Sequence, residues 1–221
     1  MNPVTTAAGD AQGAAPSRQR ARRNAMILDA VEDLLTRSPL RELNVEDITE
    51  AAGIARTRFY VYYKSKADAY AAVLARLSEQ VLASYEEPGG WYQRPRAARP
   101  RDALARTFHT VVPLWWRHRA VLREASDMWN TLPGQPDAPN QWRAVMAGFT
   151  EHARRAIERE RELGIAPPGV DAGDLAEFLM WQTERMLFLH YLDEREPDER
   201  MAEVAIQIWM RSIYLNDDPE P

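Results

Sequence analysis

The spacing of apolar residues along the chain is helical almost from end to end. Apolar side chains recur at steps of three and four residues, which is the period of an amphipathic α-helix. This period predicts helices over 20–37, 45–52, 56–62, 66–84, 101–117, 119–130, 140–163, 171–192 and 197–215. No stretch of the sequence alternates apolar and polar residues as a β-strand does. The pattern therefore predicts an all-α protein of about nine helices.

Three parts of the chain differ in character. Residues 1–19 are small and polar, which predicts a disordered arm. Residues 20–66 contain one longer predicted helix followed by two short ones, and residues 67–221 contain mostly long ones. The clearest break, "EPGGWYQRPRAARP" at 87–100, follows the helix over 66–84, which would act as a connector between the two parts.

A helix-turn-helix is predicted within 20–66. Asn44 is a good N-cap for the helix over 45–52, with Asp47 three residues further on. Only Gly53, Ile54 and Ala55 separate this helix from the next, and Gly53 can adopt φ > 0 at the corner without steric cost. Two short helices joined by a three-residue turn containing glycine form the arrangement of a helix-turn-helix.

The segment "RTRFYVYYKSKAD", Arg56 to Asp68, combines four aromatic rings with the only two lysines of the chain. Phe59 and Tyr63 are predicted to face inward as core. Arg56 and Arg58 lie at the start of the second short helix, where each could contact either a guanine edge or a phosphate. The side chains of Thr57, Tyr60, Tyr62 and Lys66 are placed to contact phosphates.

Charge is distributed unevenly over the chain. The net charge is −5, but residues 18–66 carry +3 and residues 67–221 carry −7. A basic unit joined to an acidic body indicates that only the first part meets a polyanion. The run "RQRARR" at 18–23 could reach an adjacent DNA groove or serve as a loose electrostatic anchor, and the anchor is the simpler interpretation.

Several classes of function are excluded by what the sequence lacks. It contains no cysteine, no G-x-S-x-G, no glycine-rich phosphate loop and no H-E-x-x-H. The four histidines, His109, His118, His152 and His190, are dispersed, so we expect neither a metal nor a cofactor. No apolar run reaches the length of a membrane span, and the N-terminus lacks a signal peptide. We therefore expect a cytoplasmic protein that is not an enzyme and has no membrane partner.

The last two predicted helices, 171–192 and 197–215, are apolar nearly all the way round. Such helices are buried on more than one side. A second copy of the same pair would bury the outer side, which predicts a homodimer through these helices. A fully buried helix pair in a monomer is the alternative.

The segment over 45–70 resembles the DNA-binding signature of TetR-family transcriptional regulators. The matching residues are Ile48, Ala52, Gly53, Ile54, Tyr60, Tyr62, Ser65 and Lys66. The sequence departs from the family pattern at Thr49, Ala55 and Arg58, so the operator sequence cannot be inferred from relatives. The resemblance implies binding to double-stranded DNA at a palindromic operator.

The C-terminal segment, with Glu-Arg-x-Leu-Phe at 184–188 and Ile-Trp-x-x-Ser-Ile-Tyr at 208–214, resembles the narrower group of EthR-type repressors. Their C-terminal domain encloses a long aromatic channel for an apolar ligand. The resemblance implies a channel lined by Leu104, Thr107, Val111, Trp115, Trp142, Met146, Phe149, Met180, Thr183, Leu187 and Trp209. Ordinary hydrophobic core is the alternative for the same residues.

Together these features predict a ligand-responsive transcriptional regulator, most simply a homodimeric repressor released by a small apolar effector. An enzyme or ligand carrier that keeps the helix-turn-helix only as packing is the competing class. An activator would use the same DNA surface.

Overall fold

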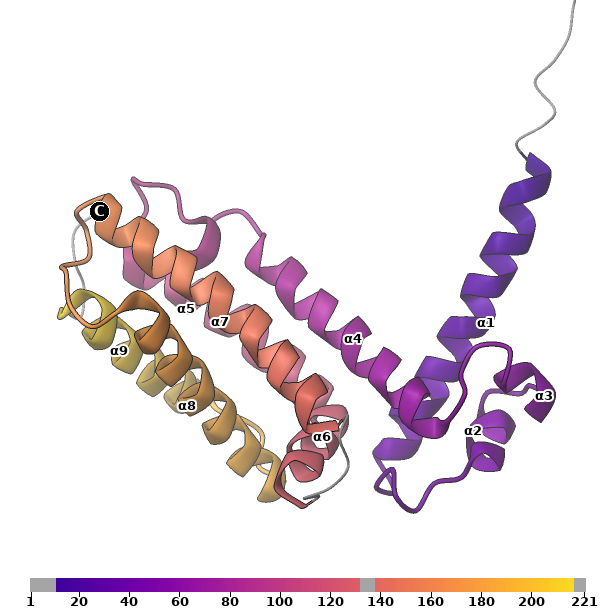
Figure 1. Ribbon diagram of the computed structural model, residues 1–221. Helices are drawn as coiled ribbons and strands as arrows, with labels where there is room; N and C mark the ends of the chain where they lie inside the picture. The colour runs from indigo at the N-terminus through magenta and orange to yellow at the C-terminus, as the bar shows by residue number, and fades with distance from the viewer. Residues whose placement is uncertain (1–10, 132–137, 217–221) are drawn as a thin grey trace, which may run out of the picture. The chain divides into compact units, whose positions relative to one another are not determined.

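The computed structural model describes residues 11–131 and 138–216, in which the chain forms nine α-helices and one 3-10 turn (Figure 1). Within these ranges there are no strands, which confirms the all-α prediction. The helices are α1 (Ala11–Leu35), α2 (Val45–Ala51), α3 (Arg56–Phe59), α4 (Lys66–Tyr85), η1 (Trp91–Gln93), α5 (Pro100–Arg117), α6 (Arg119–Thr131), α7 (Ala138–Glu162), α8 (Ala172–Leu192) and α9 (Glu199–Tyr214).

The chain divides into two compact units, 1–73 and 74–221. Helices α1, α2 and α3 belong to the first unit, and η1 with α5 to α9 belongs to the second. Helix α4 runs through the division, with its first eight residues in the first unit. None of the helices in the described part of the chain combines the length and apolar content that a membrane span needs.

Two predicted boundaries in the first unit, the start of α1 and the end of α3, were wrong. Helix α1 begins at Ala11 rather than near residue 20, because alanine, arginine and glutamine are strong helix formers even where no apolar stripe guides the prediction. Residues 1–10 of the predicted arm lie outside the described residues. Helix α3 ends at Phe59 rather than near 62. The chain turns after Phe59, and the backbone N–H groups of Tyr62 and Tyr63 both donate to the Phe59 carbonyl, at 2.9 and 3.0 Å.

The first unit packs around a small core in which each helix contributes fully buried side chains. Ile27 and Val31 of α1, Ile48 of α2 and Phe59 of α3 have no exposed surface. Asn44 forms a complete capping box with Asp47 at the start of α2, as its position in the sequence predicted.

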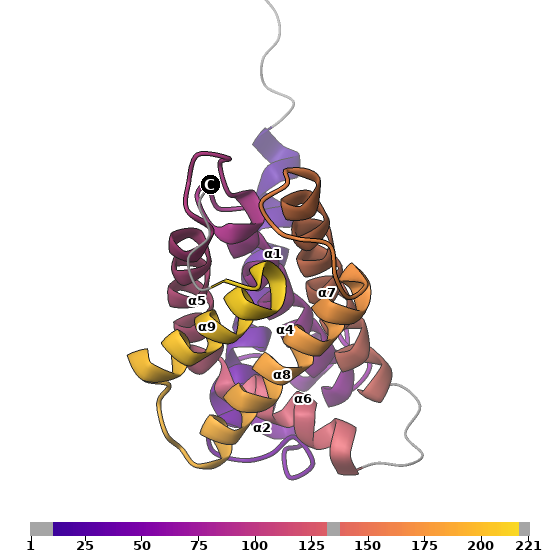
Figure 2. The ribbon, with the colours of Figure 1, turned by 90° about the vertical axis from the view of Figure 1, so that its left-hand side faces the viewer.

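The second unit is a bundle of long helices. Helices α7 and α8 pack along each other, α5 packs against α9, and α8 and α9 lie side by side (Figure 2). The segment around η1 is fixed to the bundle by the indole of Trp91, which donates to the hydroxyl of Tyr214 on α9 at 2.8 Å. Arg94, just after η1, is fully buried and forms an ion pair with the fully buried Glu160 of α7.

Candidate nucleic-acid interface and cavity

The start of α3 presents three polar side chains to solvent. Arg56, Thr57 and Arg58 are all exposed, because Gly53 adopts φ +63° and turns the chain sharply between α2 and α3. The helix begins without a side-chain cap, since Ala55 occupies the N-cap position. Its first amides and the three side chains therefore face outward together, which is the arrangement that a DNA-contacting helix needs.

Arg56 is oriented by neighbours on both sides. Its guanidinium pairs with the carboxylate of Glu46 on α2, and its Nη2 lies 3.3 Å from the hydroxyl of Tyr60. Arg58, by contrast, is exposed two residues further along the chain. A base or phosphate contact by Arg56 would therefore compete with Glu46, whereas Arg58 forms no ion pair with any residue in the described part of the chain.

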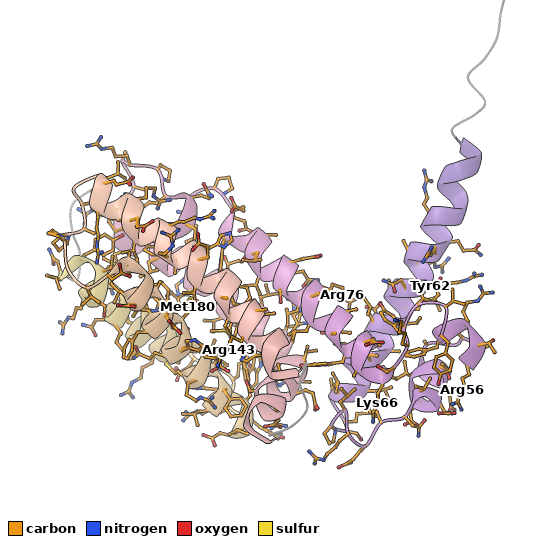
Figure 3. The ribbon with its side chains drawn as sticks, viewed as in Figure 1. Arg56, Tyr62, Lys66, Arg76, Arg143 and Met180 are labelled. Atoms are coloured by element: carbon orange, nitrogen blue, oxygen red, sulfur yellow. The ribbon has the colours of Figure 1, made fainter. Side chains whose placement is uncertain are left out.

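Tyr62 and Tyr63 hold the segment after α3 against α1. The hydroxyl of Tyr62 donates to the backbone carbonyl of Arg20 at 3.4 Å, and that of Tyr63 donates to Oδ1 of Asn24 at 2.7 Å. In Figure 3, Arg56 lies near α2 and Tyr62 lies beside α1. The contacts bring the basic part of α1 around Arg20 next to the segment that follows α3, which the sequence alone did not indicate.

Lys66 has a different environment from the one that its phosphate prediction assumes. Its ammonium donates to the carbonyls of Leu40, Arg41 and Leu43, at 2.8, 3.1 and 2.5 Å. An ammonium has three hydrogens, and these three bonds use all of them. In this structure Lys66 joins the connection between α1 and α2 to the start of α4, and a phosphate contact would require it to give up one of these bonds.

A small cavity lies inside the second unit, with a volume of about 30 Å³. Eight of the eleven residues predicted to line a ligand channel lie on its wall: Leu104, Thr107, Val111, Trp115, Met180, Thr183, Leu187 and Trp209. Such a volume holds about one water molecule. The predicted set of α5, α8 and α9 residues thus converges on one space, but that space is small and is not a long channel.

The three predicted residues from α7 lie off the wall. Trp142, Met146 and Phe149 are buried but do not line the cavity. The Trp115 ring packs against Trp142 and Phe149, with centroids 6.5 and 5.9 Å apart. Helical spacing identified this face of α7 as inward, but spacing does not reveal which inward layer a side chain occupies.

Four lining residues were not predicted: Tyr85, Tyr92, Phe108 and Val112. Phe108 and Val112 each follow a predicted lining residue on α5, so a wider inward face would have included them. The rings of Tyr85 and Tyr92 stack with centroids 4.1 Å apart. Their hydroxyls bond to each other, and burial raises the pKa of both tyrosines well above the usual range, so both stay neutral.

The polar atoms on the described wall are nearly all satisfied within the protein. Thr107 Oγ1 accepts from the Trp91 amide at 2.8 Å and donates to the Ala103 carbonyl at 3.2 Å. Thr183 Oγ1 accepts from Trp209 Nε1 at 3.1 Å and donates to the Leu179 carbonyl at 2.8 Å. The exception is the indole N–H of Trp115, which is buried and has no hydrogen-bond partner.

The second unit also has an apolar outer face on α8 and α9. Phe178, Leu189 and Leu192 of α8 are 67%, 53% and 48% exposed, and Val204 of α9 is 43% exposed. Together with Gln182 and Arg185, the α8 residues form a stripe of exposed positions at alternating steps of four and three residues. That spacing is the one that two packed helices share along a common seam.

Two family models match the chain. The model described as "Transcriptional regulator EthR, C-terminal domain" matches residues 104–215, and "Bacterial regulatory proteins, tetR family" matches residues 27–73. The chain is 29% identical over 219 residues to the HTH-type transcriptional regulator EthR of Mycobacterium tuberculosis (strain H37Rv), covering 96% of this chain and 98% of that protein. It is 28% identical over 194 residues to EthR of Mycolicibacterium smegmatis, covering 87% and 86%.

The solved structures show the same fold at lower identity. SmeT, the repressor of the Stenotrophomonas maltophilia multidrug efflux pump SmeDEF, is 18% identical and aligns with a TM-score of 0.68 over 86% of this chain and 89% of its own. SmeT has also been solved as a complex with triclosan; that structure is 20% identical, with a TM-score of 0.67 over 86% of this chain and 91% of its own.

Proposed function

Because the chain belongs to the TetR family of transcriptional regulators and carries a C-terminal domain of the EthR type, we propose that it is a homodimeric repressor released from a palindromic operator by a small apolar effector. One observation carries this proposal: a single helix, α4, begins at Lys66 in the helix-turn-helix unit and ends at Tyr85 on the cavity wall. A change at the cavity that moves α4 therefore reaches the DNA-binding unit along continuous backbone.

On the DNA side, the start of α3 is the reading element. Arg56 must break its ion pair with Glu46 before it can contact a base, whereas Arg58 can enter the major groove without breaking one. A bidentate arginine–guanine contact contributes about 1–3 kcal/mol of discrimination between bases. The arginines at 18, 20, 22 and 23 add phosphate attraction that does not depend on sequence, since no acidic residue follows them before Asp29.

For the dimer, the exposed stripe on α8 is the contact surface. Its positions, which carry Phe178, Leu189 and Leu192 together with Gln182 and Arg185, recur at steps of four and three residues and match a second copy of the same stripe related by a two-fold axis. The two copies of α3 in one dimer would then contact two half-sites, and for this reason we expect the operator to be an inverted repeat.

For the effector, the small volume of the cavity sets the energetic condition. Ligand pockets for small molecules usually measure about 300–1,000 Å³, so an effector must displace part of the wall in order to bind. It releases DNA only if it binds the expanded form better than the unexpanded one. Tyr85 is the wall residue through which an expansion would act on α4.

The proposal is tested by selecting bound fragments from random and genomic DNA with the purified chain, followed by binding titrations at several salt concentrations. We expect an inverted repeat, and we expect Arg58→Ala to reduce the preference for it over scrambled DNA by about 10-fold. Arg96→Ala, an exposed arginine of the second unit, is the matched control and should leave that preference unchanged. The competing carrier or enzyme class predicts no salt-dependent DNA affinity, and failure to recover any inverted repeat would contradict the dimeric repressor.

A further inference from the structure

The side chains that line the cavity restrict the chemical class of ligand that it can bind. Of the described residues that line it, none has an ionisable side chain except Tyr85 and Tyr92, whose hydroxyls are neutral and bonded to each other. A charged ligand would therefore lose hydration on this wall without meeting a countercharge, and apolar contacts do not recover that cost. The wall selects an uncharged molecule.

The polar side-chain atoms on the same wall divide sharply into partnered and unpartnered groups. The hydroxyls of Thr107 and Thr183 each both donate and accept within the protein, and the indole N–H of Trp209 donates to Thr183. Trp115 Nε1 is the only polar side-chain atom on the described wall that is buried without a partner. Among the polar side-chain atoms of the described wall, the Trp115 N–H is thus the donor whose hydrogen-bonding capacity is wholly unused.

The Trp115 donor is also held in place. The residue is 3% exposed, and its ring is packed from the α7 side by Trp142 and Phe149. A buried polar group without a partner normally signals a role, because native proteins satisfy nearly all such groups. A water molecule in the cavity would find one free partner here, whereas buried waters make about three hydrogen bonds, so water competes weakly for this donor.

We propose, on the basis of the effector-responsive function above, that the effector is an uncharged apolar molecule with one hydrogen-bond acceptor. This acceptor receives a hydrogen bond from the indole N–H of Trp115. An acceptor such as a ketone or ether oxygen satisfies this donor, and the rest of the ligand contacts rings and aliphatic side chains. A pure hydrocarbon would leave the donor unpaired, and a site with an unpaired buried group discriminates against the ligand that fails to pair it.

The test uses the full chain and two probes of nearly equal shape, hexanophenone and hexylbenzene, which differ by a carbonyl in place of a methylene. Dissociation constants are measured by calorimetry for both probes with the wild-type protein and with Trp115→Phe. The decisive quantity is the hexylbenzene-to-hexanophenone ratio of Kd in the wild type divided by the same ratio in W115F. This quotient cancels the different hydration of the two probes. We expect it to be about 3- to 10-fold in favour of hexanophenone.

The matched control is Trp116→Phe, one position further along α5. The Trp116 ring packs against Tyr191 and under the Arg119 guanidinium, and it is not on the cavity wall. W116F should keep the wild-type ratio of the two dissociation constants. A loss of carbonyl preference in both variants would attribute the effect to general loosening of α5 and would overturn the proposal.

A second measurement does not depend on any variant folding. In wild-type protein labelled with ¹⁵N at the indoles, hexanophenone should move the Trp115 Hε1 resonance downfield, and hexylbenzene should not. Binding of both probes with a quotient near one, or with equal Hε1 shifts, would overturn the proposed contact while leaving an apolar effector site in place. Binding of neither probe would overturn both the contact and the apolar effector site.

Discussion

The buried ion pair between Arg94 and Glu160 allows the sharpest stability prediction. Both side chains are fully buried. The guanidinium donates from Nε to Oε1 at 3.2 Å and from Nη2 to Oε2 at 2.6 Å, while Nη1 donates to the carbonyls of Pro95, Arg96 and Ala98. The pair therefore fixes the loop after η1 to helix α7.

Glu160→Gln removes the countercharge and keeps the shape. Arg94 would then be a buried cation surrounded only by carbonyl and amide groups, and breaking a buried pair in this way costs about 3–5 kcal/mol. For a unit of this size that corresponds to a fall in Tm of roughly 6–20 °C. Since whole domains are stable by about 5–15 kcal/mol, the loss would be a large fraction of the total.

Removing the other partner should cost less. In Arg94→Met, Glu160 keeps a second cation, because Nη2 of Arg159 lies 3.0 Å from its Oε1. We expect the cost to be smaller than that of E160Q by about 1.5–3 kcal/mol, the contribution of one hydrogen bond to a charged group. The double variant R94M/E160L should be less destabilised than E160Q alone, because it leaves no fully buried charge unpaired, and Arg159, which also loses Glu160, is 30% exposed.

Urea unfolding followed by tryptophan fluorescence measures these differences in the correct unit, since all seven tryptophans lie in residues 74–221. Glu158→Gln is the matched control: its carboxylate pairs with Arg154 at 2.6 Å but is 44% exposed, so the cost should be below about 1 kcal/mol. A loss below about 1 kcal/mol for E160Q as well would refute the reasoning that this pair must be complete when buried.

Three further perturbations follow from the contacts. Burial raises the pKa of Glu184 above its ordinary value of 4.5, although the Ser126 hydrogen bond and the Arg185 charge oppose this shift. The ionised carboxylate therefore destabilises the fold as pH rises above that value, so the unfolding free energy of Glu184→Gln should increase relative to that of the wild type between about pH 4 and about pH 8. A difference between the two proteins that stays constant over this range would contradict the reasoning. Lys66→Met should lose about 1.5–3 kcal/mol of local stability, seen as faster amide exchange in α2, while Lys64→Met, exposed in the same turn, should not. Asn44→Ala should cost about 1 kcal/mol through loss of the capping box, and an unchanged urea midpoint for the first unit would be evidence against that role.

The parts of the structure that depend on neighbours in sequence could be predicted. Asn44 caps α2 because an N-cap acts on amides two and three residues away. Gly53 adopts φ > 0 because the turn between α2 and α3 demands it and only glycine does so without strain. The helices of the second unit follow from an apolar period that continues over several turns.

Other features could not be predicted, since they depend on partners far away in the chain. Lys66 bonds to carbonyls 23 to 26 residues earlier, and no local pattern distinguishes such a lysine from one that contacts phosphate. Arg94 and Glu160 are 66 residues apart, and in sequence each looks like a solvated charge. Their burial follows from how η1 is packed onto α7.

The candidate cavity shows the same division. Helical period by itself determined that Leu104, Met180 and Trp209 point inward, because an amphipathic helix must bury one face. Only the tertiary structure decided that the predicted α7 residues lie off the cavity wall, that the space is small, and that the Trp115 N–H has no partner. These outcomes depend on side-chain packing and hydrogen-bond pairing among helices distant in sequence, which are set by the whole fold rather than by any segment of it.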